Sequence, residues 1–424
     1  MPRMSNMQLF KHQSDVLDKS KKFNRVAYYY DMGLGKTFIG SEKMRMLNYR
    51  VNLLVCQKSK VKDWLEHFKT YYPEYTIKDL TKNKIFNEGT NGKYIGVVNY
   101  DIVYRRDNLK NLKHFTLMLD ESSVIANEKT KRSKAILKMG ADNVILLSGT
   151  PVSGKYEKLY SQCRLLGWNI TKKEFYDRYI VTRDFQRPNM PFAIKIVVGY
   201  KNVEELKSNL RRYGAFFMKA DEAITLPLQN FITIKCEQIP EYKKFKKDRI
   251  VLIEDKEIVG ENTLTKMLGE RQLCSQYNKN KLQAFKDLLN DTDDRLIVFY
   301  NFTAEKDILV RLVERPISLV NGEKRDLENY EKYDNSVTFV QYQAGAKGLN
   351  LQKANKIIYF SLPLSCENYM QSQKRVHRIG QDRPCFYYIL ETENSIDGKI
   401  LEALNRQEDY TNRLFEEQDG ASRE

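Results

Sequence analysis

The sequence predicts an α/β protein with two tandem lobes, each a mostly parallel sheet flanked by helices. Three observations support this prediction. A chain of 424 residues with 42 % hydrophobic residues is long enough for two cores and too long for one. Short apolar or β-branched segments alternate with helical patterns, as in parallel sheets covered on both faces. The alternation restarts near residue 229, so we expect a first lobe at residues 1–228 and a second at 229–424.

Five segments of the first lobe are expected to form strands. They are Val26–Tyr30, Val51–Cys56, Tyr94–Val98, Phe115–Leu119 and Val144–Leu147. In open sheets of this kind, ligands bind at the carboxyl ends of the strands. The residues that follow each strand are therefore the first candidates for function.

A glycine-rich loop, DMGLGKT, follows the first of these strands and precedes a helical pattern. Glycines let backbone N–H groups approach phosphate oxygens, and a helix N-terminus favours negative charge. Lys36 would reach the β- and γ-phosphates and Thr37 would bind Mg²⁺. The strict P-loop pattern is not met, because Tyr30 occupies its first glycine position, and a glycine turn before a helix is the alternative. The expected nucleotide-binding residues of this loop are Met32, Gly33, Leu34, Gly35, Lys36 and Thr37.

Two adjacent carboxylates, Asp120 and Glu121, follow the apolar strand FTLML. Asp120 would hold Mg²⁺ through water, and Glu121 would orient and activate the attacking water. An acidic turn is the alternative, but the pair ends a strand that is expected to be buried.

Other strand ends carry weaker signals. Ser148 opens the segment SGTP, for which a structural turn is the favoured interpretation. Lys58 and Ser59 lie at a strand-to-helix turn and could contact a phosphate backbone. Trp64 shares a predicted helix face with apolar neighbours, which favours a core position over a stacking platform for bases.

The second lobe repeats the strand pattern without a second glycine-lysine loop, so we expect the nucleotide to bind in a cleft between the lobes. Its expected strands are Arg295–Tyr300, Ile317–Val320, Val337–Tyr342, Lys356–Phe360 and Cys385–Leu390. Gly345 and Gly348 lie in a turn that permits close approach by nucleic acid or by the other lobe, or that is only a tight loop.

The segment QSQKRVHRIGQ at 371–381 is predicted to be a helix that ends at Gly380 and Pro384. Its spacing puts Gln371, Lys374, Arg375 and Arg378 on one polar face. Arg375 and Arg378 could neutralise charge on a γ-phosphate as arginine fingers. The alternative is a solvated basic helix.

Composition narrows the class of protein. The net charge of +16 favours a polyanionic partner, although a basic surface alone would also explain it. No apolar run is long enough for a membrane span, and the N-terminus lacks the features of a signal peptide, so we expect an intracellular protein without a membrane partner. The six cysteines are widely spaced, which predicts reduced, packed thiols and no Cys/His metal site.

Taken in order, these segments resemble the Swi/Snf family of helicase superfamily two, from Gln8 to about residue 390. The resemblance rests on eight segments: LFKHQ, DMGLGKT, LLVCQKSKVKDW, LMLDESSVIAN, LLSGTPVSG, RLIVFYNF, QAGAKGLNL and QKRVHRIGQ. It implies paired RecA-like lobes and ATP-driven translocation on DNA. It assigns Gln13 to adenine, Lys36 and Thr37 to phosphate and Mg²⁺, Asp120 to the metal, Glu121 to the water, and Arg375 and Arg378 to the finger role.

The chain departs from the family pattern at several positions. Ser122 and Ser123 follow Asp120-Glu121 where the family usually has Ala-His, and that His often links hydrolysis to DNA contact. Lys374 stands where an Asp is usual, and Gln343 and Lys347 replace the usual Arg and Leu.

The resulting hypothesis is an ATP-dependent DNA translocase that uses ATP and Mg²⁺ and acts as a monomer, in the cytoplasm of a bacterial or phage-infected cell. Any protein partners are expected to belong to replication, repair or recombination. Its track would be double-stranded DNA, contacted mainly through phosphates. The expected contacts are Lys58, Ser59, Ser148, Gly345 and Lys347. The alternatives are a strand-separating helicase on DNA or RNA, although no wedge hairpin is evident, and a nucleotide-switched clamp without catalysis.

Overall fold

The computed structural model describes residues 8–82, 92–186, 192–342 and 349–415. The chain divides into unit one, Met1–Ala223 with Tyr410–Glu424, and unit two, Ile224–Asp409. The division falls five residues before the predicted boundary, and residues from Tyr410 on group with unit one, contrary to the prediction. Tyr410 packs against Tyr156 and Tyr200 of unit one, which explains this grouping. In the described ranges, no helix is both long and apolar enough to cross a membrane.

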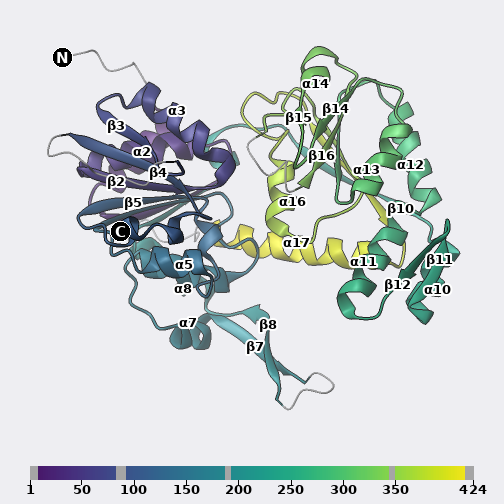
Figure 1. The fold of residues 1–424 in the computed structure, drawn as a ribbon, viewed down its shortest axis with the longest axis horizontal. Coiled ribbons are helices and arrows are strands. Elements are labelled where there is room, and N and C mark those ends of the chain that lie inside the picture. The colour runs from purple at the N-terminus through teal and green to yellow at the C-terminus, as the bar shows by residue number, and fades with distance from the viewer. Residues whose placement is uncertain (1–7, 83–91, 187–191, 343–348, 416–424) are drawn as a thin grey trace, which may run out of the picture. The chain divides into compact units, whose positions relative to one another are not determined.

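Unit one is built on a seven-stranded, wholly parallel sheet with strand order β3-β4-β2-β5-β6-β1-β9 (Figure 1). The strands are β1 (Arg25–Tyr30), β2 (Val51–Cys56), β3 (Tyr75–Asp79), β4 (Lys93–Asn99), β5 (Phe115–Asp120), β6 (Asn143–Ser148) and β9 (Ala215–Met218). All five strands predicted from the sequence are confirmed. The two that were missed, β3 and β9, are the outer strands of the sheet. Polar residues interrupt the apolar run of β3 (YTIKD), and β9 (AFFM) has only four residues.

Helices of unit one connect these strands and cover the sheet. They are α1 (Lys11–Lys19), α2 (Lys36–Leu47), α3 (Val61–Tyr71), α4 (Asp107–Lys110), α5 (Lys131–Leu137), α6 (Leu159–Leu165), α7 (Lys172–Tyr179), α8 (Val203–Arg212) and α9 (Ala220–Ala223). Helix α2 packs closely on the sheet because Gly40 has no Cβ, which would lie 2.8 Å from Leu147 and 2.9 Å from Met118. The central strands are fully buried, as expected for a parallel sheet covered on both faces.

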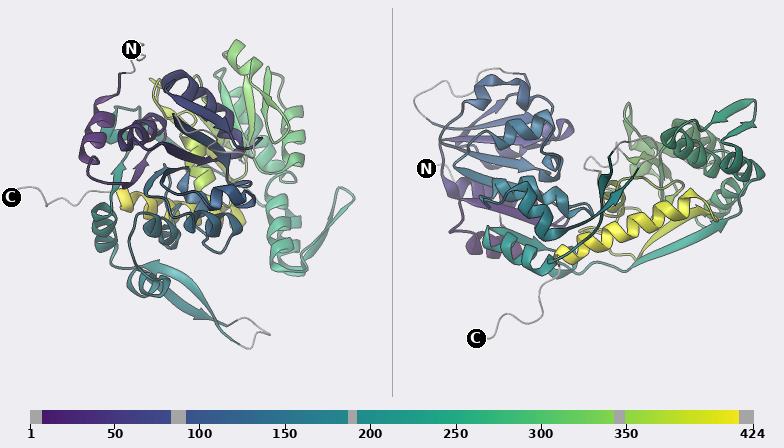
Figure 2. Two further views of the ribbon diagram at one scale, coloured as in Figure 1. Left: turned by 60° about the vertical axis from the view of Figure 1, so that its left-hand side comes forward. Right: turned by 90° about the horizontal axis from the view of Figure 1, so that it is seen from below.

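A two-stranded antiparallel hairpin extends from the body of unit one (Figures 1 and 2). It consists of β7 (Ile180–Phe185) and β8 (Ile194–Tyr200), which pair from Ile180↔Tyr200 to Phe185↔Ile194. No such hairpin is predicted from the sequence. Both strands carry exposed apolar side chains, such as Phe185 and Val198. The hairpin therefore lacks the alternation of buried apolar and exposed polar residues that predicts a strand.

Unit two contains a second seven-stranded sheet with strand order β10-β18-β17-β13-β16-β14-β15. The strands are β10 (Gln229–Cys236), β13 (Leu296–Tyr300), β14 (Ile317–Val320), β15 (Arg325–Asp326), β16 (Val337–Gln341), β17 (Lys356–Tyr359) and β18 (Cys385–Thr392). All pairs are parallel except β14 with β15. The five predicted strands of this lobe are confirmed, and the second α/β lobe is therefore present.

The remaining elements of unit two cover this sheet or form a small separate cluster. They are α10 (Pro240–Asp248), β11 (Ile250–Ile253), β12 (Lys256–Val259), α11 (Thr263–Cys274), α12 (Lys279–Asn290), α13 (Thr303–Arg311), α14 (Glu328–Lys332), α16 (Cys366–Gln373) and α17 (Ile396–Phe415). Helices α10 and α11 pack with the β11–β12 hairpin around Phe245 and Leu273. This cluster is a small subdomain attached to the sheet.

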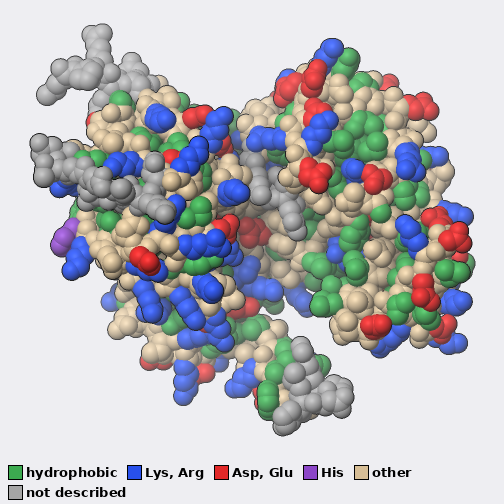
Figure 3. Space-filling model, viewed as in Figure 1, with side chains coloured by type: hydrophobic (Ala, Val, Ile, Leu, Met, Phe, Trp, Pro, Cys, Tyr) green, Lys and Arg blue, Asp and Glu red, His purple; other side chains and the backbone are tan. Residues whose placement is uncertain are grey.

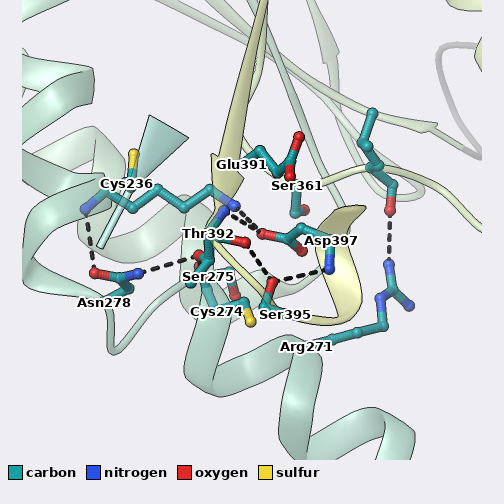
Figure 4. A network of polar contacts seen from close by, with 12 residues as sticks. Cys236, Arg271, Cys274, Ser275, Asn278, Ser361, Glu391, Thr392, Ser395 and Asp397 are labelled. Carbon is teal, nitrogen blue, oxygen red and sulfur yellow. Dashed lines mark hydrogen bonds and ion pairs between the residues drawn. The ribbon is translucent and has the colours of Figure 1, made fainter. Parts of the chain in front are cut away.

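A buried polar network joins that subdomain to the sheet of unit two. Lys281 of α12 forms an ion pair of 2.7 Å with Asp397 of α17, and both side chains are buried. Asp397 also accepts a hydrogen bond from the backbone N–H of Thr392, and Asn278 donates to the Thr392 hydroxyl (Figure 4). Cys236 and Cys274 lie beside these groups in Figure 4. All six cysteines of the chain are buried free thiols, as predicted.

Candidate nucleotide site and nucleic-acid contacts

The glycine-rich loop lies between β1 and α2, in the order that the sequence predicts. Gly33 and Gly35 have φ values of 91° and 72°, in the left-handed region that side chains disfavour. Gly35 is the N-cap residue of α2, and Lys36 and Thr37 form the first turn of that helix. The loop therefore ends at a helix N-terminus, as a phosphate site requires.

Lys36 folds back onto the end of its own strand. Its Nζ donates hydrogen bonds to the carbonyl oxygens of Tyr30, at 2.5 Å, and Asp31, at 2.9 Å. Burial lowers the pKa of Lys36, and the charges of Glu121, Asp31 and Asp120 oppose that effect. The ammonium group therefore lies among oxygen acceptors and negative charge, at the place where a phosphate would be expected.

Helix α1 packs against the loop through Gln13. The Gln13 side chain accepts a hydrogen bond from the backbone N–H of Phe10 and donates one to the carbonyl of Leu34, at 3.3 Å. A Cβ on Gly35 would lie 2.1 Å from the Gln13 amide nitrogen. The backbone conformation favours glycine at position 35, and any side chain there would also displace the Gln13 amide from the loop. Only the family resemblance identified Gln13, since nothing in the local sequence marks it.

The two carboxylates lie at the end of β5, and Trp64 of α3 contacts the first of them. The indole Nε1 of Trp64 donates a hydrogen bond of 2.8 Å to Asp120 Oδ2. Burial raises the pKa of Asp120, and the bond from Trp64 partly offsets this rise. Trp64 is buried, as predicted, but the sequence analysis missed its contact with the site. The available signal was that a buried indole N–H needs an acceptor.

Glu121 follows in a left-handed conformation, with φ 61° and ψ 64°. Its Oε1 accepts hydrogen bonds from the hydroxyl groups of Ser123, at 3.0 Å, and Ser148. Ser148 ends β6, next to β5 in the sheet, and is fully buried. A buried side chain bonded to Glu121 does not fit the nucleic-acid contact predicted for Ser148, and the SGTP turn is part of the carboxylate site instead.

The SGTP turn also approaches Lys36. A Cβ on Gly149 would lie 3.3 Å from the Lys36 amine and 3.5 Å from the Tyr30 carbonyl. Strands β5, β6 and β1 are neighbours in that order, so their carboxyl ends bring the turn between Glu121 and the glycine-rich loop. The structure thus brings together Lys36, Asp120 and Glu121 at one edge of the unit one sheet.

The oxygen donors at this edge suit a hard cation. Thr37 contributes a hydroxyl from the first turn of α2, and Asp120 contributes a carboxylate that is partly buried. Magnesium binds through oxygen ligands, commonly one or two carboxylates together with substrate phosphates and water. The residue types present therefore fit the Mg²⁺ that the sequence analysis assigned to Thr37 and Asp120.

The predicted nucleic-acid contacts are only partly described. Lys58 and Ser59 are exposed in a 3₁₀ turn after β2, which leaves them available to a phosphate backbone. Gly345 and Lys347 lie outside the described residues. In Figure 3, Lys and Arg side chains gather over the lower part of unit one, whereas acidic and basic side chains are interspersed over unit two.

The basic segment of unit two differs from the prediction. Helix α16 ends at Gln373, so Lys374, Arg375 and Arg378 lie in the turns after it and share no helix face with Gln371. The predicted helix end at Gly380 and Pro384 is wrong.

The physical reason is burial of this segment. Arg375 is 2 % exposed, and its Nη1 donates to the Leu349 carbonyl at 3.4 Å. Arg378 donates to the same carbonyl at 3.5 Å and to the Asn350 side chain, and burial lowers its pKa. Both guanidinium groups are bonded within unit two, so neither belongs to a solvated basic helix.

Comparisons with known proteins place the chain in a family. Residues 29–279 match the SNF2-related domain, and residues 280–380 match the helicase conserved C-terminal domain. The Bacillus subtilis protein YwqA, named for ATP-dependent helicase or translocase activity, is 23 % identical over 91 % of this chain and 46 % of its own length. The mouse SWI/SNF-related, matrix-associated, actin-dependent regulator of chromatin subfamily A member 1 is 24 % identical over 88 % of this chain and 40 % of its own length.

The chain thus spans less than half the length of each of these two relatives. A solved structure, the SWI2/SNF2 ATPase core of Sulfolobus solfataricus in complex with dsDNA, is 21 % identical with a TM-score of 0.47, and the match covers 98 % of this chain and 93 % of that one. The family model alone covers more than half of the present sequence. The chain therefore belongs to the SNF2-related family and carries the helicase C-terminal domain as its second part.

Proposed function

We propose that this chain is a DNA-dependent ATPase that converts ATP hydrolysis into movement along DNA. The observation that carries the proposal is the convergence of Lys36, Asp120 and Glu121 at one edge of the unit one sheet, beside a loop that ends at a helix N-terminus. Relatives named for ATP-dependent helicase or translocase activity support it.

In this proposal the glycine-rich loop binds the phosphates of ATP. The Lys36 ammonium exchanges its bonds to the Tyr30 and Asp31 carbonyls for bonds to phosphate oxygens. Gln13, at the end of α1 that faces the loop, recognises adenine. Gln13 already donates a hydrogen bond to Leu34 in the loop. Movement of Gln13 when adenine binds would therefore also move the phosphate loop.

Glu121 is the group that orients the attacking water and accepts its proton. Its carboxylate is held by side chains from two neighbouring segments, so its position is defined before nucleotide binds. Mg²⁺, when held by Thr37 and Asp120, would neutralise phosphate charge. Asp120 is kept in orientation by the Trp64 indole.

Unit two contributes Arg375 and Arg378 in this proposal. Their present acceptors are the Leu349 carbonyl and the Asn350 side chain. The Arg378 side chain is less buried than that of Arg375, so it can turn toward a phosphate at a smaller cost in free energy. We therefore expect Arg378 to provide the finger and Arg375 to shape the segment that presents it.

The track is DNA contacted through its phosphates, with Lys58, Ser59, Gly345 and Lys347 as the proposed contacts. The exposed positions of Lys58 and Ser59 and the net charge of +16 support this. Binding through phosphates predicts weak sequence specificity and a steep loss of affinity as salt concentration rises.

The test is steady-state ATPase activity without nucleic acid and then with single-stranded DNA, duplex DNA or RNA, each at low and moderate salt. We expect the largest stimulation with duplex DNA and loss of turnover in Glu121→Gln and Lys36→Ala. A Glu121→Gln variant with normal turnover would refute the mechanism, and stimulation by RNA alone would refute the track.

A strand-separating helicase is the second candidate, because the β7–β8 hairpin offers a structural element that could split a duplex. Its exposed Phe185 and Val198 are suited to contact bases rather than phosphates. A fluorescent duplex-unwinding assay discriminates the two candidates. Unwinding that is lost in the Phe185→Ser, Val198→Ser double variant, with ATPase activity retained, would favour the helicase.

A further inference from the structure

Two serine hydroxyl groups meet at one carboxylate oxygen of Glu121. Ser123 donates to Glu121 Oε1 at 3.0 Å, and Ser148 donates to the same atom. The serines come from different segments: Ser123 from the 3₁₀ turn after β5 (Ser122–Ile125) and Ser148 from the end of β6. Hydrogen bonds to a charged acceptor are stronger than neutral ones, so this pair is a defined restraint on the side chain.

The hydroxyl hydrogen of Ser148 is committed to Glu121. The Ser148 oxygen accepts a hydrogen bond of 3.2 Å from the backbone N–H of Thr150. Since a hydroxyl has one hydrogen, the orientation that accepts from Thr150 leaves that hydrogen for the carboxylate. Ser148 therefore links the position of the SGTP turn to the position of Glu121.

The backbone under Glu121 is held as well. The hydroxyl of Tyr100 donates to the carbonyl oxygens of Asp120, at 3.0 Å, and Glu121, at 3.3 Å. Glu121 has a left-handed conformation, which a side chain with Cβ adopts only where its surroundings enforce it. The carboxylate is thus positioned through both its backbone and its side chain.

Both serine-bearing segments are tied to the same buried residue, Gln162 of α6. Ser122 donates to Gln162 Oε1 at 2.7 Å, and Gln162 Nε2 donates to the carbonyl of Pro151, three residues after Ser148, at 2.9 Å. Tyr29 of β1 donates to the same Gln162 oxygen at 3.0 Å. Gln162 therefore keeps the Ser123 turn and the SGTP turn at a fixed separation.

We propose that Ser123 is a positioning residue for Glu121, and that Ser123 and Ser148 together hold the Glu121 carboxylate in its working orientation. Ser123 stands where the family pattern has His, so in this chain a hydroxyl group contacts the Glu121 carboxylate from that position. The inference rests on the proposed role of Glu121 in hydrolysis. Both serines at the departure from the family pattern then have a role: Ser122 anchors the turn to Gln162, and Ser123 contacts the Glu121 carboxylate.

The test compares Ser123→Ala, Ser123→Thr and Ser148→Ala in the full chain. Loss of one charge-assisted hydrogen bond should lower kcat for ATP roughly tenfold in each alanine variant. The KM for ATP and the affinity for a fluorescent ATP analogue should change less than about twofold, because the restraint acts on the water-activating group. Ser123→Thr, which keeps the hydroxyl, should recover most of the loss.

Ser161→Ala is the matched control, since Ser161 is a fully buried serine of the same unit, on α6. It should leave kcat near the wild-type value, and all variants should keep the wild-type melting temperature within a few degrees. Wild-type kcat in Ser123→Ala, or an equal loss in Ser123→Ala and Ser123→Thr, would overturn the inference. Glu121→Gln distinguishes failure of this inference from failure of the proposed function. If Glu121→Gln is inactive while both alanine variants have normal kcat, only the role of the serines is refuted.

Discussion

Replacing Lys281 by methionine should destabilise unit two strongly, because Lys281 is the positive partner of a buried ion pair. Its ammonium group is fully buried and lies 2.7 Å from Asp397 Oδ2. Methionine is unbranched and only one atom shorter than lysine, but it leaves the Asp397 charge without its partner. The remaining donor to that oxygen is the backbone N–H of Thr392 at 3.1 Å, in the network of Figure 4.

Removing one partner of a buried pair costs about 3–5 kcal/mol. Unit two extends from Ile224 to Asp409, and for a unit of this size each kcal/mol lowers the melting temperature by about 2–4 °C. The expected fall in melting temperature is therefore on the order of 10 °C. Thermal unfolding followed by circular dichroism measures it. Lys286→Met, at an exposed position of the same helix, is the control and should shift the melting temperature little.

A double variant, Lys281→Met with Asp397→Asn, should recover part of the loss, since no uncompensated charge remains. The pair also predicts a pH dependence. Burial lowers the pKa of Lys281, but Asp397 more than offsets this, and the pKa is raised overall from 10.5. The stabilisation that depends on a charged Lys281 is therefore lost as the pH rises through its raised pKa, above 10.5. If Lys281→Met and Lys286→Met melt at the same temperature at pH 7, the ion pair has no structural role and the reasoning is refuted.

Two further predictions concern the nucleotide site. Trp64→Phe keeps an aromatic ring but removes the hydrogen-bond donor to Asp120. The Mg²⁺ concentration that supports half-maximal ATP turnover should therefore rise roughly 10–100-fold. Trp168→Phe is the control. An unchanged requirement for Mg²⁺ would count against a role for Trp64 at the metal site. Equilibrium binding of a fluorescent nucleotide at varied Mg²⁺ concentration tests the same role without turnover. Gly35→Ala should weaken nucleotide binding, because a φ of 72° disfavours a side chain and the Gln13 amide, 2.1 Å from the new Cβ, would have to move away from the loop. Isothermal titration with ATP measures this, and wild-type affinity would show that Gln13 is not held against the loop.

The strands were predictable because fully buried parallel strands are continuous apolar segments. The segments β2 and β14 have the predicted bounds, and the other predicted strands differ by one or two residues at one or both ends. The outer strands β3 and β9 were not predicted, since β3 has polar residues within its run and β9 is only four residues long. The β7–β8 hairpin was missed for a related reason, as its stability comes from cross-strand pairing instead of a buried face.

The basic segment of unit two shows where periodicity misleads. Spacing alone put Arg375 on the face of a helix, but helix α16 ends two residues earlier. The helix ends there because the backbone N–H of Arg375 bonds to Ser372, three residues back, and its guanidinium is engaged with Leu349. Leu349 lies 26 residues away in sequence, so no local pattern predicts its contact with the guanidinium group.

The carboxylate site shows a different limit. The sequence placed Asp120 and Glu121 at the end of a buried strand, and the structure confirms that position. It could not place Ser123, Ser148 and Trp64 around them, because these contacts arise where separate strands end at one edge of the sheet. A departure from a family pattern then looks like a loss when only sequence is considered. The geometry argues otherwise: orienting a carboxylate requires donors at the right distance, and two hydroxyl groups held by Gln162 meet that requirement without an imidazole. We therefore expect hydrolysis to persist in this chain without an imidazole at residue 123.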